Sequence, residues 1–150
     1  MKQVLCEVGT NTYGIDISKV QGIDKNLEIV PVPNVSELIE GIVNLRGVVV
    51  PILSLHRKFH VEPNPNSAET SYIITVIAGM LVGFRVDAVA EIVEIPDEEV
   101  HPVPVIIASG DTAYIDSIIR VQDKLVLVLD VEGILDDAEK GRIAKLVEEQ

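Results

Sequence analysis

Short runs of Val, Ile and Leu recur along the whole chain, and each run ends at Gly, Asn, Asp or Pro. Branched aliphatic side chains pack well on a pleated surface, whereas the residues that end the runs favour turns. Aromatic residues make up only 3% of the chain, so its core has to be built from these aliphatic runs. The pattern predicts an all-β protein. The expected strands span residues 4–8, 13–17, 23–32, 42–45, 48–53, 72–77, 81–86, 92–95, 118–121 and 124–129.

Three helical segments are expected beside the strands, at residues 35–40, 54–59 and 136–150. Asn34 can cap the first segment through its side-chain oxygen. Asp136 and Glu139 have the spacing of a capping box, and the apolar residues that follow them recur at i, i+3 and i+4. The last segment is therefore predicted to be a C-terminal helix with one apolar face.

The chain also repeats itself. Residues 14–20 and 83–89 share the pattern Gly, apolar, polar, apolar, two variable positions and Val, and residues 41–45 align with 117–121 in the same order. These matches predict two similar β-subdomains, approximately 14–65 and 70–125, and leave open an exchange of terminal strands. Evenly spaced short strands favour two small barrels, because closure removes exposed sheet edges.

Charge and cysteine content narrow the class of protein. The net charge is −12, with 12 basic residues against 24 acidic ones, so phosphate-rich partners such as nucleic acids or an anionic membrane surface are not expected. Cys6 is the only cysteine, which excludes an internal disulfide, and its apolar neighbours predict a buried, inert thiol. No apolar signal region opens the chain, because Glu7 interrupts it, so a soluble cytoplasmic protein is expected.

Motifs for catalysis or metal binding are nearly absent. His56 and His60 have i, i+4 spacing, but no third ligand is evident and two basic residues stand between them, so no metal site is expected. The stretch Ser-Gly-Asp-Thr-Ala around Asp111 is the basis of one alternative, a small β-rich hydrolase of unrecognised type. Ala113 replaces the glycine of the Asp-Thr-Gly loop of aspartic proteases, and a single copy lacks the symmetric partner that such a loop needs, so a binding module is the favoured class.

Several polar residues stand at the ends of apolar strands. Asp16, Asp87 and Asp130 are predicted to cap helices or form turns. Arg46, which is followed by Gly47, stands between two apolar runs. Residue patterns alone favour a solvated turn for Arg46, because turns are generally polar, and leave a recognition contact as the alternative.

Longer stretches resemble the CheW family of bacterial chemotaxis coupling proteins. They are Tyr-Gly-Ile-Asp-Ile-Ser-Lys-Val-Gln at 13–21, Gly-Ile-Val-Asn-Leu-Arg-Gly-Val-Val-Val-Pro-Ile at 41–52 and Val-Gly-Phe-Arg-Val-Asp-Ala-Val at 82–89. The resemblance runs from about residue 3 to residue 135, and Asn-Leu-Arg-Gly-x-x-x-Pro is its most specific part.

The resemblance implies a CheW-like domain over 1–135, built from two five-stranded Src-homology-type β-barrels packed together, and a C-terminal helix at 136–150. It implies no enzymatic activity and no cofactor. The implied function is an adaptor that couples the cytoplasmic tips of methyl-accepting chemotaxis receptors to the histidine kinase CheA. Such a protein is cytoplasmic and reaches membrane receptor arrays through its partners.

The resemblance also implies a receptor-facing groove between the barrels. Its residues in this chain would be Ile17, Val20, Gly41, Asn44 and Arg46. Gly22 departs from the pattern, since the family often has an acidic residue there, and this departure bears on affinity and on the choice of partner. Residues that contact the kinase are not identified by the sequence.

Overall fold

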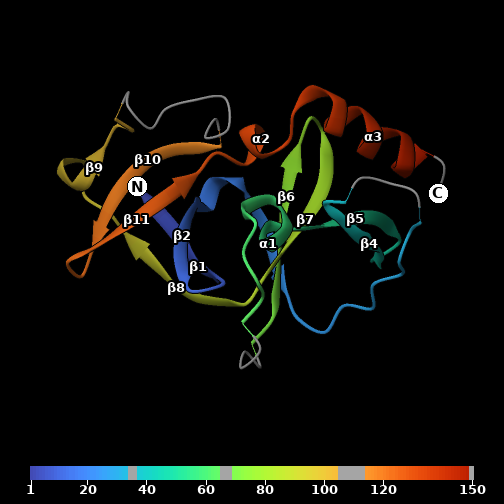
Figure 1. The fold of residues 1–150 in the computed structure, drawn as a ribbon, viewed down its shortest axis with the longest axis horizontal. Helices are drawn as coiled ribbons and strands as arrows, with labels where there is room; N and C mark the ends of the chain where they lie inside the picture. Colours follow the sequence, from blue (N-terminus) through green and yellow to red (C-terminus); the bar gives the residue numbers. More distant parts are fainter. Residues whose placement is uncertain (34–36, 65–68, 105–113, 149–150) are drawn as a thin grey trace.

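The computed structural model describes residues 1–33, 37–64, 69–104 and 114–148 (Figure 1). Strands dominate. They are β1 (Lys2–Val8), β2 (Asn11–Asp16), β3 (Val20–Asp24), β4 (Ile39–Leu45), β5 (Val48–Ser54), β6 (Ser71–Ile77), β7 (Met80–Val86), β8 (Ala88–Glu94), β9 (Val100–His101), β10 (Ile115–Val121) and β11 (Lys124–Leu129). The helices are α1 (Leu55–Phe59), α2 (Val131–Ile134) and α3 (Asp137–Glu148), with 3₁₀ turns η1 (Ile17–Lys19) and η2 (Asp97–Glu99).

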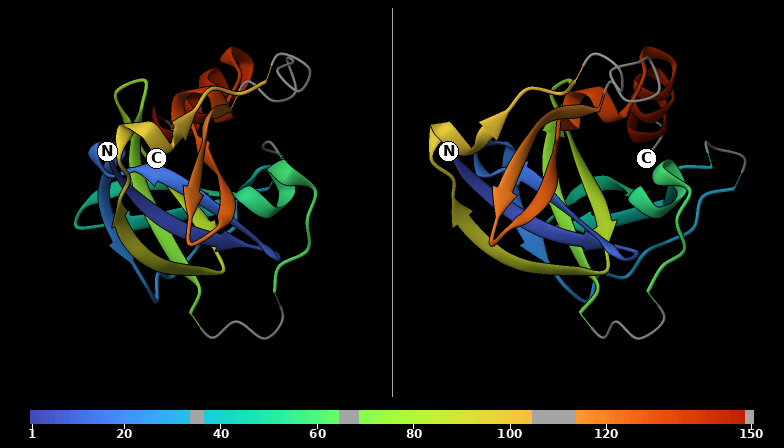
Figure 2. Two further views of the ribbon diagram at one scale, coloured as in Figure 1. Left: turned by 90° about the vertical axis from the view of Figure 1, so that its left-hand side faces the viewer. Right: turned by 60° about the vertical axis from the view of Figure 1, so that its left-hand side comes forward.

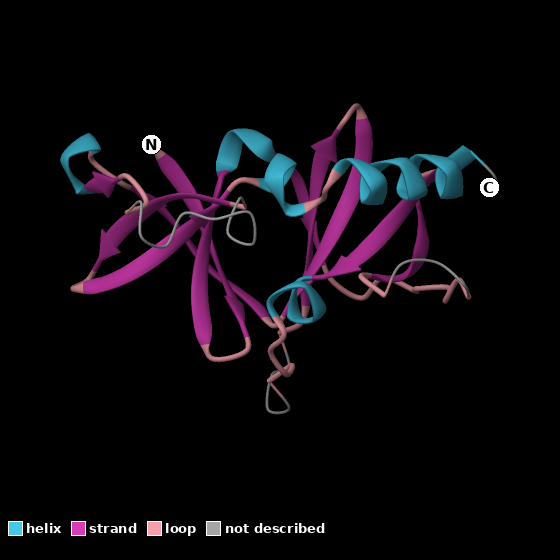
Figure 3. Cartoon of the chain, turned by 45° about the horizontal axis from the view of Figure 1, so that its top comes forward, coloured by secondary structure: helices cyan, strands magenta, loops and turns pink. Residues whose placement is uncertain are grey.

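The strands form two sheets that lie side by side (Figures 1 and 3). One sheet has six strands in the order β8-β1-β2-β11-β10-β9, and the other has five in the order β3-β6-β7-β5-β4. Both are antiparallel except for one parallel pair each, β2 with β11 and β5 with β7. The predicted all-β class is confirmed.

The two sheets repeat the same arrangement, as the sequence predicted. Gly14 in β2 lies between Leu5 of the antiparallel neighbour β1 and Val128 of the parallel neighbour β11. Gly83 in β7 lies in the same way between Ile74 of β6 and Ile52 of β5. The segments that begin at Gly14 and Gly83 therefore occupy equivalent strands.

The division of strands between the sheets differs from the predicted subdomains 14–65 and 70–125. Strands β6 and β7 belong with β3, β4 and β5, while β8 to β11 return to pair with β1 and β2. Each sheet thus combines strands from both halves of the chain. After β2 the chain passes from the six-stranded sheet to the five-stranded sheet, and after β7 it passes back. The two halves of the chain therefore exchange strands in both directions, and the exchange involves more than the terminal strands.

Each sheet closes on itself through one continuous segment. In the five-stranded sheet, β3 pairs with β6 at one edge, and Val30 farther along forms a bridge with Ile42 of β4 at the opposite edge. In the six-stranded sheet, β8 pairs with β1 and the following β9 pairs with β10. Since one segment meets both edge strands, each sheet curls into a barrel, and exposed backbone edges are reduced.

Closure explains two segments where sequence prediction was wrong. The strand expected at 23–32 ends at Asp24, and Asn26 has a left-handed backbone with φ of 58° that redirects the chain toward the opposite edge. The helix expected at 35–40 is not formed over its described part, because Ile39 starts β4 and pairs with Leu53. The barrel offers Ile39 a buried partner that a short isolated helix lacks.

Apolar side chains form three clusters. The largest, which we call the central cluster, lies between the sheets and includes Val4, Cys6 and Phe84. A second cluster fills the six-stranded barrel around Ile119, and a third fills the five-stranded barrel around Ile52. The alternation of side chains along each strand therefore serves a barrel interior on one side and the central cluster on the other.

The predicted C-terminal helix is confirmed as α3. The Asp136 amide donates to Glu139 Oε1 at 3.0 Å and the Glu139 amide donates to Asp136 Oδ1 at 2.7 Å, which completes the capping box. Ile143 and Leu146 are buried in the central cluster. Figure 2 shows α2 and α3 together on one side of the molecule. Over the described ranges, the chain holds no helix with the length and apolarity to cross a bilayer.

Candidate functional site

The turn that carries Arg46 is a tight two-residue connection. Leu45 pairs with Val48, so only Arg46 and Gly47 lie between β4 and β5. Their φ angles are 53° and 87°, as expected when both central residues of a hairpin turn are left-handed. The Gly47 amide donates to Asn44 Oδ1 at 2.8 Å, which fixes the turn from the strand that precedes it. The turn predicted at Arg46-Gly47 is therefore confirmed.

Left-handed geometry alone does not distinguish Arg46. The β10–β11 turn carries Gln122 at the matching place, with φ of 49°, and the β6–β7 turn carries Ala78 with φ of 50°. Arginine, glutamine and alanine are all unfavoured there relative to Asn, Asp or Gly. What distinguishes Arg46 is its position beside a pocket.

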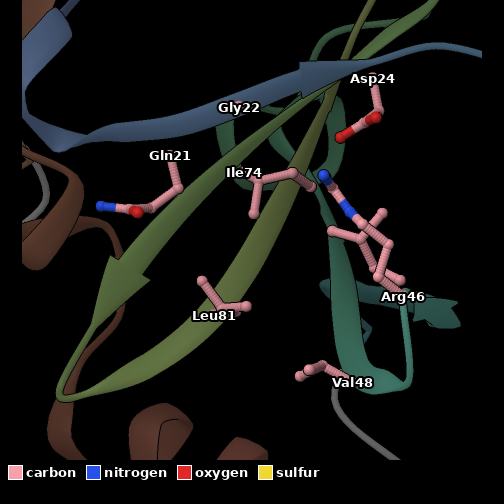
Figure 4. Close-up of a pocket in the computed structure, with 8 residues that line it drawn as sticks. Gln21, Gly22, Asp24, Arg46, Val48, Ile74 and Leu81 are labelled. Carbon is pink, nitrogen blue, oxygen red and sulfur yellow. The ribbon is translucent and has the colours of Figure 1, made fainter.

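A pocket of about 260 Å³ opens at the end of the five-stranded barrel (Figure 4). It is bounded by β3, by the start of β5, by β6 and β7, and by the β4–β5 turn. Its lining residues are Gln21, Gly22, Asp24, Leu45, Arg46, Val48, Ile74 and Leu81. Leu45, Ile74 and Leu81 also belong to the apolar cluster inside the barrel, so the pocket has an apolar floor and a polar rim.

Opposite charges face one another at this rim. Figure 4 shows the Arg46 side chain extending toward Asp24, and they are the one cation and the one anion among the lining residues. Asp24 Oδ2 is buried and has no hydrogen-bond partner within the described chain. Gly22 lies beside it, because a Cβ at that position would be 3.8 Å from Asp24 Oδ2. The carboxylate of Asp24 thus adjoins the place that a side chain at residue 22 would enter.

Ile17 and Val20 lie elsewhere. Ile17 opens η1, whose start is capped by Asp16 through a 2.9 Å hydrogen bond from the Ser18 amide, and Val20 begins β3. Both side chains are half-buried against the central cluster and do not line the pocket. They face the junction of the two sheets, while Arg46 stands at the barrel's open end.

Gly41 has a packing role that sequence reasoning did not foresee. It lies in β4 where the Val30 segment crosses, and a Cβ there would collide with the Val30 carbonyl oxygen and lie 2.6 Å from Ile29 Cγ2. The glycine therefore permits closure of the five-stranded barrel. It is buried and does not line the pocket.

A buried pair, His56 and Asp87, was also missed. His56 Nε2 and Asp87 Oδ2 lie 2.8 Å apart, and the same oxygen accepts from the amides of Gly9 at 2.7 Å and Asn64 at 3.2 Å. Burial acts to raise the pKa of Asp87, but the hydrogen bonds from His56, Gly9 and Asn64, together with the charge of His56, outweigh it, so the pKa is lowered. No local pattern links two residues so far apart in sequence.

The other candidates have structural roles or are not placed. Asp130 caps α2 by accepting from the Glu132 amide at 3.1 Å, as its position predicted. His60 is exposed just beyond the end of α1, whereas His56 is buried within it. In the described ranges, no three His, Cys, Asp or Glu side chains gather around a common metal position. Asp111 lies outside the described residues.

Comparisons with known proteins agree on one family. The family model of the CheW-like domain matches residues 2–139. The chain is 29% identical to the chemotaxis protein CheW of Treponema pallidum, over 95% of this chain and 86% of that protein. It is 30% identical to the CheW of Klebsiella aerogenes, over 91% of this chain and 82% of that protein.

A solved structure extends this likeness to three dimensions. The crystal structure of the scaffolding protein TtCheW from Thermoanaerobacter tengcongensis superposes with a TM-score of 0.83 at 30% identity. The superposition covers 92% of this chain and 94% of that one.

Proposed function

The chain belongs to the CheW-like domain family and is a non-catalytic chemotaxis scaffold, and we propose that it couples receptor tips to a kinase. The proposed partners are the cytoplasmic tips of methyl-accepting receptors on one side and a CheA-type histidine kinase on the other. Through them the protein would be held at receptor arrays in the cytoplasm. The alternative of a hydrolase centred on Asp111 has no support from the family.

The observation that carries the receptor contact is the placement of Arg46. Its guanidinium is exposed, it projects from a turn fixed by Asn44, and it stands beside an apolar pocket. A guanidinium offers five donors in a planar fork and stacks on apolar surfaces, and such arginines are common binding hot spots. A helical receptor hairpin that lays apolar residues over the pocket would meet this fork at its edge.

The remaining site residues fit the proposal in different ways. Ile17 and Val20 would offer apolar contacts at the junction of the sheets, next to the strand that leads to the pocket. Asn44 would act by holding the turn under Arg46. Gly41 would act indirectly, because it lets the Val30 segment close the barrel that presents this turn.

Calorimetric titration of a soluble receptor tip fragment into three variants tests the proposal. Arg46→Ala should lower receptor affinity at least about 30-fold, as loss of a hot-spot arginine of about 2 kcal/mol implies. Gln122→Ala is the matched control, since it makes the same truncation in the equivalent turn of the other sheet. Arg46→Lys keeps the charge but loses the fork, so it should resemble Arg46→Ala.

Kinase binding separates a lost contact from a lost fold. Both Arg46 variants should still bind a CheA regulatory domain, because our proposal assigns this turn to the receptor contact alone. Equal receptor affinity for Arg46→Ala and wild type, with both folded, would return Arg46 to the status of a solvated turn residue.

A further inference from the structure

Asp24 is an acidic side chain of the pocket that the proposed function has not used. One of its carboxylate oxygens is buried and accepts no hydrogen bond, although leaving a buried acceptor without a partner is unfavourable, most of all when the acceptor is charged. Arg46 is the one cation among the lining residues, and the described structure contains no ion pair between Arg46 and Asp24. The Arg46 guanidinium therefore extends toward the Asp24 carboxylate without an ion pair between them (Figure 4).

We propose that the pocket receives a side-chain carboxamide from an Asn or Gln of the receptor tip, beside Arg46 and Asp24. The carboxamide oxygen would accept from Arg46, and its NH₂ group would donate to Asp24. The inference rests on the proposed function, since it names the chemical group that the same site recognises.

The arrangement of charges argues against other partners. A carboxylate could accept from Arg46 but would stand beside Asp24, and two neighbouring negative charges repel. An ammonium could pair with Asp24 but would meet Arg46. A carboxamide carries two donors and one acceptor without net charge, so it satisfies both sides at once. Its methylene stem would lie against Val48 and Leu81 on the apolar wall.

Gly22 contributes the space that this partner needs. It lines the pocket from β3, and a side chain there would enter beside Asp24 Oδ2. Because Gly22 has no side chain, it does not cover the part of Asp24 that lines the pocket. The pair formed by Gly22 and Asp24 thus gives this chain its own specificity at a site where Arg46 alone would accept any hydrogen-bond acceptor.

The direction in which Asp24→Ala changes receptor affinity distinguishes a carboxamide partner from a carboxylate partner. If a carboxamide binds, Asp24→Ala and Asp24→Asn should weaken binding of the receptor tip fragment by about tenfold or more, because a hydrogen bond to a charged acceptor is lost. If the partner is a carboxylate, both variants should bind more tightly, since a repelling charge is gone. Glu91→Ala is the matched control, because Glu91 occupies the equivalent of position 22 in the other sheet and is exposed.

A double-mutant cycle identifies the partner residue. Each Asn and Gln of the fragment's tip is replaced by Ala, and affinity is measured against wild type and Asp24→Ala. One amide should cost about tenfold with wild type and less than about threefold with Asp24→Ala. Absence of any coupled amide would overturn the inference.

The free energy of unfolding of Asp24→Ala tests whether Asp24 acts in binding or in folding. Asp24→Ala should not lower the free energy of unfolding, because it removes an unpaired buried oxygen; a loss of both stability and affinity would assign Asp24 to the fold instead. Failure of the inference is distinct from failure of the proposed function. If Arg46→Ala weakens receptor binding and Asp24→Ala does not, only the carboxamide partner is excluded. If neither variant changes receptor affinity, the pocket is not the receptor-binding site.

Discussion

The imidazole Nε2 of His56 and the carboxylate Oδ2 of Asp87 lie 2.8 Å apart, with side-chain exposures of only 2% and 5%. His56 is in α1, which follows a strand of the five-stranded sheet, whereas Asp87 stands at the crossover into β8 of the six-stranded sheet. The Gly9 amide, from the β1–β2 hairpin, donates to the same oxygen. The buried Asp87 carboxylate therefore contacts groups that belong to both sheets.

Acid should reduce the contribution of Asp87 to the free energy of unfolding. The folded pKa of Asp87 is lowered, so its contribution to stability is present above the unfolded pKa of about 3.9 and is lost as pH falls through the folded value. At pH 7, Asp87→Asn should lower the free energy of unfolding by about 3–5 kcal/mol, because His56 loses its charged partner. The difference from wild type should shrink below about pH 4. Urea titrations between pH 7 and pH 3 measure it, with the exposed Asp116→Asn as control, and parallel curves would contradict it.

Two glycine substitutions should have opposite effects on stability. Gly41→Ala puts a methyl group against Ile29 and the Val30 carbonyl, so it should lower the free energy of unfolding by about 1–3 kcal/mol. Gly141→Ala has open space in α3 and should raise it by about 1 kcal/mol. Chemical denaturation compares them. If Gly41→Ala lost receptor binding at unchanged stability, Gly41 would be a direct contact and not a packing residue.

Asn44 should matter through the turn that it holds. Asn44→Ala removes the acceptor of the Gly47 amide, so stability should fall by about 1 kcal/mol and Arg46 should be presented less well. Receptor affinity should fall with it, whereas Asn44→Asp, which keeps an acceptor oxygen, should retain most of both. Calorimetry on the two variants would refute this role if Asn44→Ala bound the receptor fragment like wild type.

Val20 and Val89 form a natural pair for testing the junction of the sheets. They hold matching places in the repeat, and both are half-buried against the central cluster. Val20→Asp should weaken receptor-tip binding by a few kcal/mol, about what an unpaired buried charge costs in an interface. Val89→Asp should affect stability similarly but leave binding nearly unchanged. Equal binding losses in both variants would mean that the effect is one of folding alone.

Cys6 should be unreactive in the native protein. Burial, and secondarily the charge of Glu7, raise the pKa of its thiol to about 12, and thiolate is the reactive form. At pH 8 a thiol reagent should modify the protein only as fast as it unfolds, and in urea the thiol should react at once. Rapid labelling of the folded protein would show that the interior around β1 opens locally.

Much of this architecture follows from local sequence. Alternating aliphatic residues between turn signals placed most strands, and the likeness of the segments at Gly14 and Gly83 predicted their equivalent positions. Which strands pair across the molecule was not predictable in this way. The crossover after β2 and the return of Val30 to β4 depend on barrel closure, which no single segment encodes.

The candidate site shows the same division. The Asn-Leu-Arg-Gly stretch predicted the turn, because its geometry is set by adjacent residues. Two other relationships join residues that are far apart in the sequence. Asp24 and Arg46 line the same pocket, and His56 pairs with Asp87. Asp24 showed no pattern of its own in the sequence, since a single carboxylate at the end of a short strand can have many roles.

The reciprocal crossover between the halves has a mechanical consequence. Each half of the chain contributes strands to both sheets. A force between partners bound to opposite barrels would therefore act on the backbone hydrogen bonds between paired strands as well as on apolar contacts. Neither half of the chain could be withdrawn without dismantling both barrels. A cut within 61–69 should therefore leave two fragments that stay clasped together, and that separate only when the entire molecule melts.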